Sequence, residues 1–116
     1  MAALFMMLIV TAGLQAQTFT VLHTFTGQGD GSNPIAGLTL DRAGNLYGTT
    51  SNLQFPPGNG TVFKLSRAGS GWILNTLYAF QGGTDGANPQ ARVIFGPDGT
   101  LYGTTTYGGL GFGTVF

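Results

Sequence analysis

The chain has 116 residues, a formal net charge of zero and only 7 % charged residues, against roughly 25 % in an average soluble domain. Its four Lys and Arg residues are too few to form the basic patch that binds a nucleic-acid backbone, and the absence of cysteine excludes disulfides, thiolate nucleophiles and Cys-based metal sites. With 21 glycines, five prolines and 42 % hydrophobic residues, the composition favours a folded all-β chain over a disordered or helical one.

The N-terminal residues differ from the rest of the chain. Residues 2–10, AALFMMLIV, are continuously apolar and precede the small-residue segment TAGLQAQ. An apolar run of about ten residues is too short to span a bilayer and has the length of a signal-peptide core. We therefore predict a signal peptide over residues 1–16, cleaved after Ala16, and no transmembrane span in this segment. No Lys or Arg precedes the apolar run, so either the true start lies upstream or the signal is a weak one. The alternative reading of the run is a buried N-terminal strand.

Segments with the composition of β-strands follow, separated by short turns that contain glycine. In FTVLHTF, residues 19–25, alternate side chains share one face, as in a strand. The further predicted strands are 37–41, 45–51, 61–66 and 72–80. Short Gly-containing turns between them favour antiparallel pairing.

Two copies of one unit become visible when the chain is shifted by 55 residues, which aligns residues 22–37 with 77–92 and residues 44–50 with 99–105. The repeat-defining residues of the first copy are Asp30, Gly31, Asn33, Pro34, Leu46, Tyr47, Gly48, Thr49 and Thr50. Those of the second copy are Asp85, Gly86, Asn88, Pro89, Leu101, Tyr102, Gly103, Thr104 and Thr105. Matches in a fixed order over this length indicate an internal repeat.

The end of the unit fixes its length. The motif GTVF occurs at residues 60–63 and again at 113–116, now 53 residues apart, because the first copy has two extra residues in the preceding loop. We therefore divide the chain into a first β repeat over residues 17–71 and a second over residues 72–116, truncated at its C-terminus.

About four short antiparallel strands per unit are typical of a propeller blade, and a period near 50 residues is also found in kelch repeats. We predict tandem four-stranded blades that form part of a β-propeller; a parallel β-solenoid is the alternative. Leu46 and Leu101 are expected to pack between blades, and Gly48 and Gly103 to admit a neighbouring backbone or form a bulge. Because the chain stops at Phe116, inside the second copy, we expect further repeats or self-association to cover its open edge.

The segments YAFQGGTDGANPQA, GTLYGTTTYGGLGFGTVF and GNGTVFKLS together resemble the GloVer tandem repeat, over nearly all of the chain after residue 17. That repeat occurs in secreted bacterial proteins described as choice-of-anchor proteins, whose arrays often end in a sorting or anchoring signal. The first copy departs from the pattern, because His23 replaces an aromatic residue and Gln28 interrupts the glycine pair. The resemblance implies an exported, surface-associated array and brings no assigned reaction.

The most polar repeated elements are DGSNP, residues 30–34, and DGANP, residues 85–89. A calcium site is one reading, but one Asp per loop is a poor cage for an ion that takes six to eight oxygens. We read both as turns, in which Asp caps the backbone and Gly takes a positive φ. His23 occupies the place of Tyr78 in the other copy, so we expect a half-buried, hydrogen-bonded ring rather than a general base.

No catalytic or metal-binding residues and no cofactor are predicted, because each Asp lies at a turn signal and no nucleophile motif occurs. Three aromatic residues in the variable loops, Phe55, Tyr107 and Phe112, are candidates for binding a sugar or a protein partner. The predicted function is an exported non-catalytic module for extracellular interaction or structure. The alternative is the N-terminal part of a propeller glycoside hydrolase or lyase acting on extracellular polysaccharide.

Overall fold

A computed structural model describes residues 13, 15–52 and 58–116. These ranges contain strands and no helix, so the all-β prediction is confirmed. The strands are β1 (Thr39–Leu40), β2 (Leu46–Thr50), β3 (Thr61–Ala68), β4 (Gly71–Ala79), β5 (Ile94–Phe95), β6 (Leu101–Tyr102), β7 (Thr104–Thr105) and β8 (Thr114–Val115). The predicted signal peptide, residues 1–16, lies almost entirely outside the described residues.

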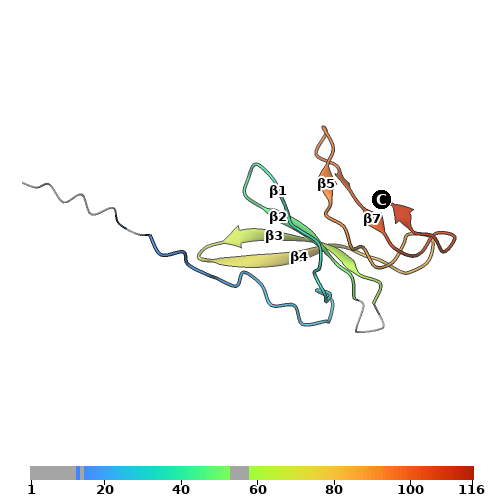
Figure 1. Cartoon of the computed structure of the whole chain (residues 1–116), viewed down its shortest axis with the longest axis horizontal. Coiled ribbons are helices and arrows are strands. Elements are labelled where there is room, and N and C mark those ends of the chain that lie inside the picture. Colours follow the sequence, from blue (N-terminus) through green and yellow to red (C-terminus); the bar gives the residue numbers. More distant parts are fainter. Residues whose placement is uncertain (1–12, 14, 53–57) are drawn as a thin grey trace, which may run out of the picture.

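Strands β1 to β4 form one antiparallel sheet in sequence order (Figure 1). Its longest ladder joins β3 to β4, from the pair Thr61 and Ala79 to the pair Ala68 and Gly71 at the hairpin. β-Branched and aromatic residues along β3 and glycines at the turn explain this hairpin locally. β4 begins at the boundary predicted between the two repeats, so the sheet combines three strands of the first repeat with the first strand of the second.

The strand predicted over residues 19–25 is not formed, although its equivalent in the second repeat is β4. β4 has a backbone partner, β3, whereas residues 19–25 have no ladder partner among the described residues. The segment is extended and exposed at its start, and its end is held by an edge-to-face contact between Phe25 and Phe63, with ring centroids 5.2 Å apart. The sequence pattern is strand-like, and the missing partner explains the difference.

The second repeat builds the same arrangement from shorter pieces, which we call the C-terminal ladders: β5 with β6, and β7 with β8. The two are continuous, because Gly103 and Phe116 exchange two backbone hydrogen bonds of 3.0 Å across the gap between β6 and β7. In the first repeat, Gly48 of β2 pairs with Phe63 of β3 in the same way. The order of strands is therefore the same in both repeats.

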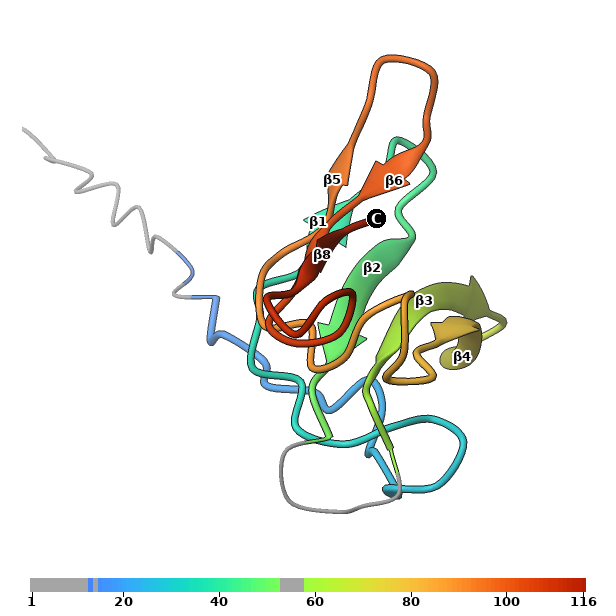
Figure 2. The same cartoon turned by 90° about the vertical axis from the view of Figure 1, so that its right-hand side faces the viewer.

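The C-terminal ladders lie against one face of the four-stranded sheet (Figures 1 and 2). Between them is a small core of Val62, Phe80 and Val93, against which Tyr47, Leu101 and Phe116 pack. Leu101 thus packs between the repeats as predicted. Aromatic edges join the two layers, because Tyr47 meets Phe95 at 5.0 Å and Phe80 meets Phe116 at 5.1 Å between ring centroids.

The glycine of the repeated hexapeptide lies beneath an aromatic ring. A Cβ atom at Gly48 would stand 2.5 Å from Cζ of Phe63 and 2.9 Å from Cδ2 of Leu38, and one at Gly103 would overlap the ring of Phe116. The prediction that a neighbouring backbone lies close to Gly48 and Gly103 is wrong. The close neighbour of each glycine is instead a phenylalanine ring, Phe63 or Phe116, from the adjoining ladder. The expected bulge is absent at Gly48, since the register shift of the sheet lies between Val62 and Phe63.

Candidate functional site

The Asp residue of each DGxNP motif closes its own turn. Oδ2 of Asp30 accepts a hydrogen bond from the amide of Thr26 at 2.9 Å, and Oδ1 accepts one from the Thr26 hydroxyl at 2.6 Å. In the second repeat, Oδ2 of Asp85 accepts a hydrogen bond from the amide of Gln81 at 2.9 Å. The residue four positions before each Asp thus supplies these donors, which is the geometry of a capped turn.

His23 and Tyr78 make the same contact in the two repeats. Nε2 of His23 lies 3.1 Å from Oδ2 of Asp30, and the hydroxyl of Tyr78 donates to Oδ2 of Asp85 at 2.8 Å. The His23 side chain is 24 % exposed. A tyrosine and a histidine therefore act as interchangeable donors to the turn carboxylate, and the structure confirms the half-buried, hydrogen-bonded ring predicted for His23.

The protonation equilibria of these two turns follow from the same contacts. Desolvation raises the pKa of Asp30, but the hydrogen bonds from Thr26 and His23 outweigh it and bring that pKa below its ordinary value. The amide of Gln81, followed by the hydroxyl of Tyr78, lowers the pKa of Asp85, and the same Tyr78–Asp85 hydrogen bond raises the pKa of Tyr78. Both carboxylates are therefore anions at neutral pH, whereas a general acid requires a raised pKa.

The remaining two aspartates cap hairpin turns. Asp41 accepts hydrogen bonds from the side chain and amide of Asn45, the hydroxyl of Tyr47 and the amide of Ala43, and its pKa is lowered, chiefly by Asn45. Asp98 accepts from the amide and hydroxyl of Thr100, which lower its pKa. All four aspartates of the chain are thus used by their own turns.

The Asn-Pro halves of the two motifs tie each turn to the residue that follows the repeated hexapeptide. Asn33 and Asn88 have φ values of 56° and 54°, a left-handed conformation that asparagine tolerates better than most residues. Their carbonyls accept hydrogen bonds from the amides of Ser51 and Thr106, both at 3.1 Å. Pro89, which follows Asn88, is completely buried. These residues position backbone, and they bring no side-chain donor set together.

The threonine that ends each hexapeptide forms a hydrogen bond to a threonine on the next strand of its ladder. Thr50 and Thr61 place their hydroxyl oxygens 2.8 Å apart, and Thr105 and Thr114 do the same at 2.8 Å. The amides of Thr61 and Thr114 also donate to these hydroxyls. Thr49 differs, because its buried hydroxyl has no hydrogen-bond partner among the described residues.

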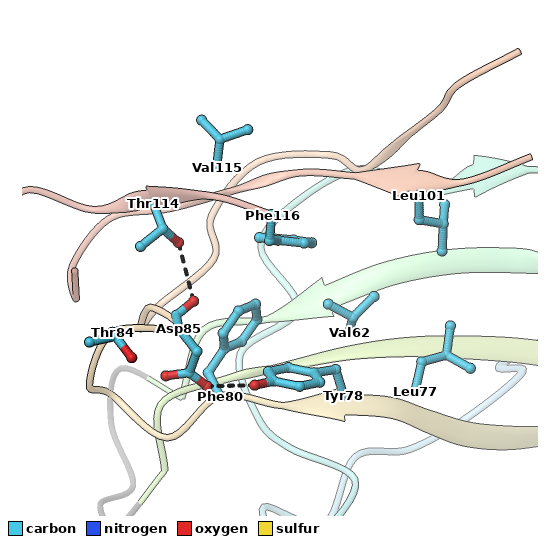
Figure 3. A pocket seen from close by; sticks show the side chains of 10 residues that line it. All are labelled: Val62, Leu77, Tyr78, Phe80, Thr84, Asp85, Leu101, Thr114, Val115 and Phe116. Atoms are coloured by element: carbon cyan, nitrogen blue, oxygen red, sulfur yellow. Dashed lines mark hydrogen bonds between the residues drawn. The ribbon is translucent and has the colours of Figure 1, made fainter. Parts of the chain in front are cut away.

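A pocket of about 440 Å³ lies between β4 and β8 (Figure 3). Its walls are largely apolar and come from both repeats: Val62, Leu77, Tyr78, Phe80, Thr84, Asp85, Leu101, Thr114, Val115 and Phe116. Three of the polar groups that line it are paired, since the Tyr78 hydroxyl donates to the Asp85 carboxylate and the Thr114 hydroxyl donates to the Asp85 carbonyl at 3.2 Å. The pocket can receive apolar groups, and its one carboxylate is held by the fold.

Of the three aromatic residues predicted to bind a partner, the structure describes Tyr107 and Phe112. Tyr107 and Phe112 lie in the glycine-rich loop between β7 and β8 with exposed rings, and the Phe112 side chain is 94 % exposed. The same loop exposes Leu110 at 96 %, a residue that the aromatic pattern missed but that the flanking glycines signal as a loop tip. Phe55 lies outside the described residues. The loop is anchored, because the amide of Gly109 donates to the carbonyl of Gly83 at 2.9 Å.

The described part of the chain carries neither a metal-binding cluster nor a membrane-spanning helix. Within residues 13, 15–52 and 58–116, no three His, Cys, Asp or Glu side chains gather in a way that could hold a metal ion. The described ranges also contain no helix with the length and apolarity that crossing a membrane requires.

The duplicated turns, strands and ring-over-glycine contacts define the class of the molecule: a tandem-repeat protein made of antiparallel β units. The chain belongs to the Gloeobacter/Verrucomicrobia repeat family, whose model matches residues 8–116. The resemblance found in the sequence is thereby confirmed. No curated protein and no solved structure matches the chain.

Proposed function

We propose that the chain is an exported, non-catalytic repeat module for extracellular interaction and structure, with its units arranged as blades of a β-propeller. The observation that carries the proposal is the use of the carboxylates. All four aspartates accept hydrogen bonds from their own turns and have lowered pKa values. Groups that a hydrolase would use for acid–base chemistry are here devoted to shaping the repeat.

The blade arrangement is supported by the direction of the ladders and by the stacking of the repeats. Each ladder among the described strands is antiparallel, whereas a parallel solenoid would pair the strands of successive rungs in parallel. The four-stranded sheet is covered on one face by the ladders of the following repeat. Successive antiparallel sheets packed face to face are the building principle of a propeller.

Export is proposed from the apolar run at residues 2–10 and from the family resemblance. Its test is the intact mass and N-terminal sequence of the protein from its native producer. An N-terminus at Gln17 in the extracellular or envelope fraction would support export. An unprocessed chain in the cytoplasm would refute it.

The partner that we propose is an extracellular protein or carbohydrate that contacts the loop between β7 and β8. The exposed rings of Tyr107 and Phe112 on an anchored loop support this assignment, since such rings stack on sugars and serve as interface anchors. Affinity electrophoresis of the 116-residue chain against a panel of bacterial and plant polysaccharides measures carbohydrate binding. Phe112→Ala is expected to weaken binding about tenfold, while Phe19→Ala, at an exposed phenylalanine outside the loop, is the matched control.

The same incubations test the absence of catalysis. Release of reducing ends or of unsaturated sugars, abolished by Asp85→Asn, would replace this proposal by the glycoside hydrolase or lyase. Binding without product release, sensitive to Phe112→Ala only, would support the non-catalytic module.

A further inference from the structure

A second, larger cleft opens between the turns of the two repeats, with a volume of about 1290 Å³. One wall is the turn of the first repeat, within residues 25–33, another is residues 58–61, and a third is residues 79–81 at the end of β4. The lining residues all lie between Phe25 and Gln81, well inside the chain. The volume exceeds the roughly 300–1,000 Å³ of an ordinary small-molecule pocket, which leaves room for an elongated ligand.

Hydrogen bonds between the repeats hold these walls in place. The hydroxyl of Thr76 on β4 donates to the carbonyl of Gly29 in the first turn at 3.0 Å. The carbonyl of Asn59 accepts the amide of Asn88, in the second repeat, at 2.7 Å. The cleft is therefore formed before any ligand arrives, which limits the entropy lost on binding.

The polar groups of the cleft are neutral. Its described lining consists of side-chain amides, hydroxyls, glycines, an alanine and phenylalanine rings, with no charged side chain among them. A charged ligand would lose hydration here without gaining a counter-charge. A side-chain amide offers both donors and an acceptor, which matches the donor and acceptor capacity of a hydroxyl group. The lining therefore favours a neutral ligand that carries many hydroxyl groups.

The turn of the first repeat does not need the side chain of Gln28, which lines the cleft and is exposed. The carbonyl of Gln28 accepts the amide of Gly31 at 3.0 Å, which closes the turn. In the second repeat a glycine stands at the same position, and the carbonyl of Gly83 accepts the amide of Gly86 at 3.4 Å. Because the backbone closes both turns, the side-chain amide of Gln28 is available to a ligand.

Two further amides of the cleft stand where the other repeat has aromatic residues. Asn52 aligns with Tyr107, and Asn59, by the 53-residue offset of the GTVF motif, aligns with Phe112. The two repeats thus keep the residues that form their turns and strands and differ at these loop positions. Loop positions of this kind commonly determine which ligand binds.

A protein partner fits this cleft less well than a sugar. Protein interfaces are centred on exposed apolar and aromatic anchors. The exposed large apolar side chains of the described residues lie outside the cleft, and the ring of Phe25 in its wall is half-buried.

We propose that this cleft binds a neutral oligosaccharide. The sugar hydroxyls exchange hydrogen bonds with the side-chain amides of Gln28, Asn52 and Asn59, and a sugar ring packs on Phe25. The site is separate from the loop between β7 and β8, and it rests on the proposed function only in binding sugar without turnover.

Affinity electrophoresis of the 116-residue chain tests the site with neutral soluble polysaccharides, namely a glucan, a mannan and an arabinoxylan, and with anionic polygalacturonate. Gln28→Ala and Asn59→Ala are each expected to weaken binding of the neutral polysaccharide about fivefold, because each removes a hydrogen-bonding group. Gln90→Ala and Asn75→Ala, at exposed amides outside the cleft, are the matched controls and should leave binding unchanged. Urea midpoints of all four variants check that the fold is kept.

The outcomes separate this site from the proposed function. No binding of the three neutral polysaccharides, equal effects of the cleft and control substitutions, or tighter binding of polygalacturonate would overturn the cleft. Binding that Phe112→Ala abolishes but Gln28→Ala and Asn59→Ala leave intact would also overturn it, and would keep the loop of the proposed function. Binding that depends on Asn59 and is accompanied by release of reducing ends would support the cleft and overturn the non-catalytic role.

Discussion

The two repeats share their turns almost bond for bond but differ in burial. In both, the turn Asp accepts an amide from four residues earlier, the paired Thr hydroxyls lie 2.8 Å apart, and a phenylalanine ring covers the hexapeptide glycine. Yet Val62 is buried beneath the C-terminal ladders, whereas its equivalent Val115 is exposed among the described residues. Local structure is thus a property of the repeat, and burial is a property of its neighbours.

The largest expected difference between the repeats concerns the covered glycines. Phe63 is 2 % exposed and its ring packs against Phe25, and a Cβ at Gly48 would meet both this ring and Leu38, so there is no room for a new side chain. Gly48→Val is expected to cost on the order of 2–4 kcal/mol of unfolding free energy through overpacking. Gly103→Val should cost less, because Phe116 is only partly buried.

Urea unfolding of the two variants measures this comparison. Gly29→Val is the matched control, since a Cβ at Gly29 has no neighbour within 4 Å. If Gly48→Val were no worse than Gly29→Val, the ring-over-glycine contact would not constrain the fold.

Next in size is the buried threonine pair of β2. Thr50→Val removes the hydroxyl that accepts the amide of Thr61 at 3.1 Å, and leaving that buried amide unpaired should cost about 1–3 kcal/mol. Thr49→Val removes a buried hydroxyl that has no partner among the described residues, so it should be neutral or stabilising. Differential scanning calorimetry ranks the two variants; a Thr49→Val protein that melts earlier than Thr50→Val would contradict the assignment of their hydroxyls.

The stability of the Asp85 turn should depend on alkaline pH, because its partner Tyr78 has a raised pKa, which distinguishes it from the Asp30 turn with its partner His23. The four aspartates have folded-state pKa values below their ordinary 3.8, so the stability they contribute is present above that value and is lost as the pH falls through the folded pKa values. The pKa of Tyr78 is raised above its ordinary 10.0, so its contribution is present below pH 10.0 and is lost as the pH rises through the folded pKa.

Urea midpoints measured from acid to alkaline pH check both directions. Tyr78→Phe is expected to remove the alkaline loss that Tyr78 causes and to leave the acid limb contributed by Asp30, Asp41 and Asp98. An alkaline limb identical in wild type and Tyr78→Phe would show that the Tyr78–Asp85 hydrogen bond does not stabilise the second turn.

The smallest effect is expected at the position where the two repeats carry different residues, His23 and Tyr78, that make the same hydrogen bond. His23→Tyr should change the unfolding free energy by less than about 1 kcal/mol, because a tyrosine hydroxyl makes the equivalent bond at Asp85. His23→Phe, which keeps a ring but has no donor, is the control and should be less stable than His23→Tyr. The reverse order would argue that the Asp30 hydrogen bond is not what holds this ring.

Much of this structure was predictable from local sequence signals. The Asp, Gly and Asn residues of DGxNP predict turns because each satisfies the backbone within a few residues, and the structure has those turns. The hexapeptide predicts strands β2, β6 and β7 through its β-branched and aromatic residues. The exposure of Leu110 is not indicated by the aromatic pattern, which marks only Tyr107 and Phe112 in that loop.

The repeat, the all-β class, the turns and the hydrogen-bonded ring of His23 were predictable from the sequence, because each depends on contacts within one unit or on comparison of two units. The packing of one unit on the next left residues 19–25 unpaired while β4 pairs, and it placed a phenylalanine ring over Gly48. It also decided that Val62 is buried and Val115 is exposed. These outcomes depend on which strand or sheet stands next to a segment, and equivalent residues in a repeat carry no record of that neighbour.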